Sequence, residues 1–150
     1  MTKPTSYRWI VLAVFLVITA AIEIQWLTFA PIARQARDFY GVSALQIDLL
    51  SLLFMGVFVI MALPASYVLD NYGLRIGVGI GAVLTGIFGL VKGFFGDSYT
   101  LVVFAQIMLA IGQPFILNAA TKVAGVWFPL RERASAVGIA TLAQFLGIII

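Results

Sequence analysis

Apolar residues occur in five long runs along the chain, and short polar segments separate one run from the next. Each run is close to the roughly 20 residues that an α-helix needs to cross the hydrocarbon core of a bilayer. The pattern therefore predicts an all-α membrane protein, with spans at about residues 9–32, 49–69, 76–95, 101–128 and 134–150.

The composition agrees with this pattern and excludes a soluble domain. Of the 150 residues, 63% are hydrophobic and 10% are charged, whereas soluble domains have about 45–50% apolar and about 25% charged residues. The chain has no cysteine and no histidine, so we expect neither a metal site nor a cofactor. A membrane-embedded enzyme would need clustered histidines, cysteines or paired acids, and we therefore do not expect an enzyme.

The basic residues follow the distribution that topology rules predict for a membrane protein rather than that of a nucleic-acid-binding protein. We expect an integral, multi-pass protein of the plasma (cell inner) membrane with a cytoplasmic N-terminus. Lys92 lies near the end of the third span, and its side chain is expected to reach water on the opposite side. The basic residues assigned to the cytoplasmic side are Lys3, Arg8, Arg75, Lys122, Arg131 and Arg133.

A carboxylate, Glu23, interrupts the first run roughly 21 Å from Trp9 at 1.5 Å per residue, which is near the middle of the membrane. A charge facing lipid there is costly, so Glu23 should face the protein interior. Thr19, Glu23, Trp26 and Ala30 share one helix face, and an indole ring attracts cations. Glu23 and Trp26 therefore form a candidate receptor for an organic cation, and Glu23 could also bind a coupling proton or ion.

Further polar residues of the first and fourth spans complete a candidate substrate site. Gln106 and Gln113 are seven residues apart and share one helix face, next to Pro114. Gln25 and Asn118 are additional candidates. Two alternatives stay open: the glutamines form hydrogen bonds between packed helices, and Glu23 bonds to Gln106 or Gln144 while Trp26 only packs.

The short link between the second and third spans contains Asp70, Gly73 and Arg75, and Gly73 can supply the positive φ of a tight turn. This segment resembles the major facilitator signature loop Gly-x-x-x-Asp-x-x-Gly-x-Arg, with Ser66 in place of the first glycine. The resemblance implies that Asp70 and Arg75 hold a cytoplasmic gate closed against a second half. A solvated turn is the alternative. The charged segment Arg131, Glu132 and Arg133 is expected to anchor or gate the same side.

A closer resemblance is to the feline leukaemia virus subgroup C receptor-related transporters. It implies movement of choline, ethanolamine or haem, with Trp26 as the cation-facing aromatic residue and with Gln113 and Gln144 beside it. Glu23 departs from the family pattern, which has a small residue there. The resemblance rests on Gln25-Trp26, Tyr40–Ser43, Ile47-Asp48, Leu69-Asp70, Tyr72–Arg75, Gln113, Phe115–Leu117, Val126–Phe128, Gln144 and Leu146-Gly147.

Together these features predict a major facilitator helical bundle, of which the chain forms the first five helices of the N-terminal six-helix half. The fifth run is still apolar at Ile150, so we expect the second half to be absent from this sequence and to act as a partner. The expected function is movement of a small organic solute, such as a choline-like cation, by alternating access. The alternatives are an efflux carrier for other organic compounds and a receptor that binds without transporting.

Overall fold

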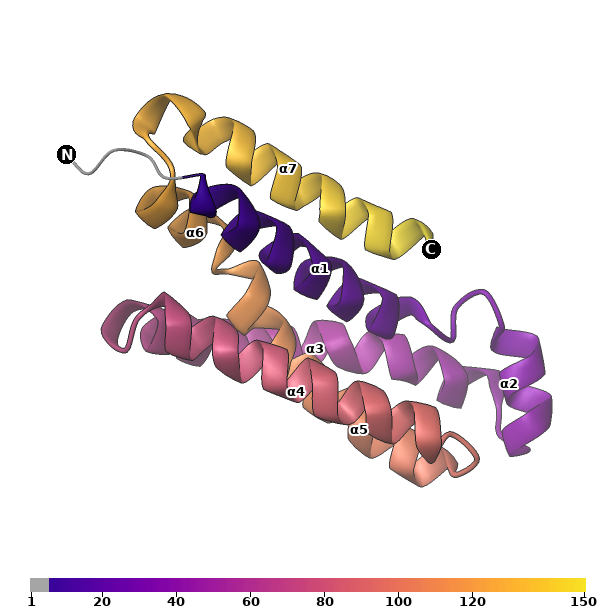
Figure 1. The fold of residues 1–150 in the computed structure, drawn as a ribbon. Helices are drawn as coiled ribbons and strands as arrows, with labels where there is room; N and C mark the ends of the chain where they lie inside the picture. Colours follow the sequence, from indigo (N-terminus) through magenta and orange to yellow (C-terminus); the bar gives the residue numbers. More distant parts are fainter. Residues whose placement is uncertain (1–5) are drawn as a thin grey trace.

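The computed structural model describes residues 6–150, so Lys3 lies outside the described residues. These residues form a bundle of long, roughly aligned helices with no strand in that range, and two short helices interrupt the series (Figure 1). The all-α prediction is confirmed. The helices are α1 (Tyr7–Leu27), α2 (Ala33–Tyr40), α3 (Ala44–Asn71), α4 (Leu74–Phe94), α5 (Tyr99–Leu117), α6 (Ala120–Trp127) and α7 (Leu130–Ile149).

Four segments are long and apolar enough to cross a membrane: α1, α3, α4 and the stretch Tyr99–Trp127, which contains α5 and α6. The charged residues Arg131, Glu132 and Arg133 occupy the start of α7 and shorten its apolar stretch. The fifth span over residues 134–150 therefore stays a prediction.

Two helix boundaries differ from the spans expected from the apolar runs. The first helix ends at Leu27, and Ala33–Tyr40 forms the separate helix α2, which the apolar pattern did not predict. Pro31 explains this break, because proline lacks a backbone donor and disfavours helical geometry in the residue before it. The fourth span is interrupted at Asn118, where α5 ends. Asn118 donates hydrogen bonds to Ala62 and Ser66 of α3 at this point.

Glycines allow two pairs of helices to approach closely, and these contacts place the site-bearing helices. A Cβ added at Gly81 of α4 would lie 3.0 Å from the carbonyl oxygen of Gly112 in α5. One added at Gly147 of α7 would lie 2.6 Å from the carbonyl oxygen of Ala20 in α1. Small residues are the usual means by which membrane helices pack backbone to backbone. As a result, α7 packs along α1, and α5 packs along α4 (Figure 1).

Candidate functional site

A pocket of about 260 Å³ lies between α1, α3, α5 and α7. Two residues of α1, Glu23 and Trp26, form part of its wall, and amide side chains come from α5 and α7. The rest of the wall is apolar. The lining residues are Glu23, Trp26, Met55, Phe58, Val59, Gln113, Leu117 and Gln144.

Glu23 is fully buried, although it is a carboxylate in an apolar helix. Its Oε1 accepts a hydrogen bond of 3.4 Å from Nε2 of Gln113. Gln144 of α7 is a second amide donor facing this carboxylate, as one of the open alternatives expected. No bond of regular distance and angle ends on Oε2, which is buried, among residues 6–150. Buried polar atoms nearly always have a partner, so this oxygen favours either a donor group of a ligand or protonation, which removes its charge.

The indole of Trp26 is held by α3. Its Nε1 donates a hydrogen bond of 3.1 Å to the carbonyl oxygen of Ser51, and its ring lies 6.5 Å from that of Phe54, centroid to centroid. This bond uses the only polar atom of the indole. The ring therefore presents only aromatic surface to the pocket.

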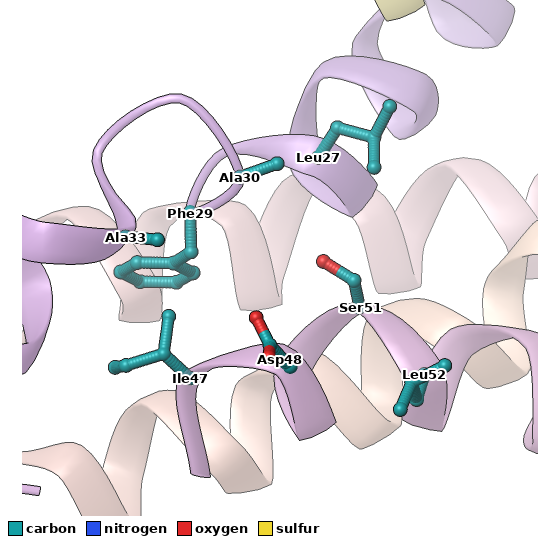
Figure 2. Close-up of a pocket in the computed structure, with 8 residues that line it drawn as sticks. All are labelled: Leu27, Phe29, Ala30, Ala33, Ile47, Asp48, Ser51 and Leu52. Carbon is teal, nitrogen blue, oxygen red and sulfur yellow. The ribbon is translucent and has the colours of Figure 1, made fainter. Parts of the chain in front are cut away.

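A second pocket, of about 290 Å³, lies where the α1–α2 turn meets the start of α3. Figure 2 shows Asp48 and Ser51 rising from α3 toward Phe29 and Ala30 of this turn. All the other residues that line this pocket are apolar. Ser51 thus borders this pocket with its side chain and holds Trp26 with its carbonyl group.

The structure brings together four of the residues expected to bind substrate: Glu23, Trp26, Gln113 and Gln144. The other three do not line this pocket. The side chain of Gln25 lies beside Gly89 of α4. Gln106 is fully buried and bonds to the end of α1, and Asn118 ties the end of α5 to α3.

Thr19 and Ala30, the other two residues of the expected α1 stripe, also do not line this pocket. Thr19 is buried and donates to the carbonyl oxygen of Phe15 in its own helix. Ala30 lies beyond the end of α1 and borders the second pocket. The expectation that Lys92 reaches water is wrong: its side chain is buried and bonds to α1 and to Gln106 of α5.

The expected gating residues lie at the end of the bundle opposite α2, at the α3–α4 turn and the start of α7 (Figure 1). Gly73 has φ of 90°, which confirms the expected positive φ. Asp70 forms an ion pair with Lys122 of α6, while Arg75 is exposed. The short turn supplies Asp70, but its partner lies 52 residues away in sequence, and no local pattern indicated that pairing.

The charged start of α7 makes a second set of contacts at this end. Glu132 pairs with Arg8 at the start of α1, with an N–O distance of 2.9 Å. Arg133 donates to the carbonyl oxygens of Gly125 and Phe128, and Arg131 is exposed. Arg8 and Glu132 thus join α1 to α7, a contact that no sequence pattern indicated.

These apolar helices, packed around a largely apolar pocket that contains a buried carboxylate, define an integral, multi-pass membrane protein with an all-α bundle. The family model described as Major Facilitator Superfamily matches residues 7–150, and the chain belongs to this superfamily. This membership favours membrane transport over enzymatic activity.

Within this superfamily, the chain is similar to several curated transporters and solute carriers. The choline/ethanolamine transporter FLVCR1 of Felis catus is 31% identical over 97% of this chain and 26% of that protein. FLVCR2 of Homo sapiens, also named a choline/ethanolamine transporter, is 31% identical over 99% of this chain and 28% of that protein. Solute carrier family 49 member A3 of Danio rerio is 32% identical over 95% of this chain and 32% of that protein. The chain therefore spans about a quarter to a third of the length of these relatives.

Proposed function

We propose that this chain is the N-terminal part of a transporter that moves a small organic cation by alternating access. The observation that carries the proposal is the pairing of a fully buried carboxylate, Glu23, with an indole, Trp26, in one pocket. The names of two relatives, choline/ethanolamine transporters, support a cationic substrate.

The chemistry of the pocket suits such a cation. A carboxylate in a low-dielectric site attracts a positive charge far more strongly than one in water, and the face of Trp26 adds a cation–π contribution. The amides of Gln113 and Gln144 supply both donors and acceptors for a substrate hydroxyl group. In this proposal a second half of the protein forms the opposite wall of the site.

Glu23 could also couple transport to a proton. No regular hydrogen bond ends on its Oε2 within the described part of the chain, so protonation when the site is empty would remove a buried charge that is only partly compensated. A cationic substrate would then displace the proton when it binds. This exchange would make uptake depend on the pH gradient across the membrane.

The charged end of the bundle is the proposed cytoplasmic gate, in a protein of the plasma membrane with its N-terminus inside the cell. Asp70 and Arg75 flank the α3–α4 turn, and Arg131, Glu132 and Arg133 lie at the start of α7. The exposed charges are available to a second half, and the Asp70–Lys122 pair would exchange partners as the gate opens and closes.

Counterflow of labelled choline and ethanolamine in proteoliposomes containing the full-length protein tests this proposal. Exchange of either label that is saturable and reduced by Glu23→Gln supports it. Binding without counterflow would instead indicate a receptor. Counterflow of neither compound, together with export of other organic compounds, would indicate an efflux carrier.

A further inference from the structure

Lys92 is a buried cation surrounded by neutral oxygen atoms. Its Nζ donates to the carbonyl oxygen of Gln25 at 2.8 Å, to Oγ1 of Thr28 at 3.1 Å and to Oε1 of Gln106 at 3.2 Å. It also lies 5.3 Å from the centroid of the Phe29 ring. Within residues 6–150 the ion pairs join other residues, and none includes Lys92.

These acceptors belong mainly to the end of α1, which stops at Leu27. The last carbonyl groups of a helix have no partner inside the helix and form the negative end of its dipole. Nε2 of Gln106 donates to the carbonyl oxygens of Gln25 and Trp26, at 3.4 and 3.3 Å. The side chains of Lys92 in α4 and Gln106 in α5 therefore cap the C-terminal end of α1.

The end of α1 is also where the pocket residues lie. Trp26 is the next residue after Gln25, whose carbonyl group Lys92 binds, and Glu23 lies within the same helical turn. Unwinding or shifting this last turn would move the indole relative to Gln113 and Gln144. An ammonium group from α4 that holds the turn in place therefore fixes the geometry of the pocket from outside it.

We propose that Lys92 is a positioning residue: it fixes the end of α1 against α4 and α5 and so sets the placement of Trp26 and Glu23 in the pocket. This inference rests on the proposed function only where it treats the pocket as the substrate site. Without Lys92, the part-buried oxygens of Gln25 and Thr28 and the buried oxygen of Gln106 lose a charged donor, and the end of α1 loses the cation that opposes its dipole.

A thiol reporter tests the position of α1 without reference to transport. The chain has no cysteine, so Leu27→Cys places one thiol at the end of α1 in a full-length protein cleared of other cysteines. Lys92→Met keeps the side-chain length and removes the charge. We expect it to increase the rate of maleimide labelling at residue 27 by about tenfold, since the last turn opens more often. Lys92→Arg keeps the charge and should restore most of the protection.

Transport kinetics of the same variants test the effect on the pocket. Lys92→Met should raise the KM for labelled choline by about tenfold and change the maximal rate by less than about twofold, because the pocket is displaced but not removed. Leu90→Ala, on an exposed face of the same helix, is the matched control and should change neither labelling nor KM.

The outcomes separate this inference from the proposed function. Unchanged labelling and unchanged KM in Lys92→Met would overturn the positioning role. Faster labelling in a protein that transports no cation would support the positioning role and reject the proposed function. If Lys92→Met does not fold, Gln106→Leu provides the second test, since it removes one acceptor of Lys92 and two bonds to α1; unchanged labelling there would also overturn the proposal.

Discussion

Gln113 of α5 donates a hydrogen bond to Glu23 of α1, with 3.4 Å between Nε2 and Oε1, and no regular hydrogen bond ends on the second carboxylate oxygen among residues 6–150. The two residues are 90 apart in sequence, and their bond joins α1 to α5. The amide of Gln113 thus satisfies one oxygen of the buried Glu23 carboxylate. The other oxygen is the part of the site that a proton or a cation would occupy.

Replacing Glu23 with glutamine should raise the KM for a cationic substrate at least about tenfold, because a desolvated charge partner is lost. It should also remove the response of uptake to an imposed pH gradient. Uptake of labelled choline in proteoliposomes, with and without the gradient, measures both effects. Asp97→Asn removes an exposed carboxylate from the α4–α5 turn and serves as the control. A gradient response that survives Glu23→Gln would reject proton coupling at this residue.

Trp26→Ala should weaken uptake of the cation by about 2- to 30-fold, the range that corresponds to a cation–π contribution of about 0.5–2 kcal/mol. The amount of protein in the membrane should not change. Trp9→Ala is the matched control, because Trp9 belongs to the same helix and packs on Phe128, away from the pocket. Equal effects of the two substitutions on KM would show that Trp26 has no special contact with substrate.

The Asp70–Lys122 pair should affect gating more than stability. Both side chains are partly exposed, and such pairs contribute about 0–1 kcal/mol to folding. Asp70→Asn should therefore leave the melting temperature nearly unchanged and lower the maximal transport rate severalfold. The charge-swapped variant Asp70→Lys with Lys122→Asp should recover part of that rate. No recovery in the swap, with turnover unaffected by Asp70→Asn alone, would argue against a gate at this turn.

Gly147→Ala should destabilise the contact between α7 and α1. The added methyl group would lie 2.6 Å from the carbonyl oxygen of Ala20 and 2.8 Å from Cβ of Glu23, so the helices must separate. We expect a loss of about 1–3 kcal/mol, visible as a lower melting temperature in detergent. Gly138→Ala, in the same helix, has no heavy atom within 4 Å of the added carbon and should be neutral or slightly stabilising. Similar melting temperatures for the two variants would contradict this packing.

Long apolar runs were sufficient to predict the helical bundle, since bilayer thickness sets the length of a span. The short helix α2 was missed because Ala33–Tyr40 is polar and follows Pro31, so it looks like a loop in a hydropathy pattern. Lys92 was misplaced for a different reason. Its acceptors lie on α1 and α5, and no local pattern in α4 indicates where those helices end.

The candidate site was predicted in part, and helix geometry explains the division. Glu23 and Trp26 are three residues apart and fall on one face, so the stripe placed both in the pocket. Gln25 is only one residue from Trp26, but a rotation of about 100° per residue directs its side chain toward Gly89 instead. Gln106 and Gln113 share a face of α5, yet they lie two turns apart and meet different partners.

The hydrogen bond from Trp26 ends on a main-chain atom, the carbonyl oxygen of Ser51. Every amino acid has that acceptor, so the anchor of the indole does not depend on which side chain occupies position 51. That side chain faces the neighbouring pocket in Figure 2. Substitutions at residue 51 can therefore change the shape of the second pocket without loosening the aromatic wall of the first.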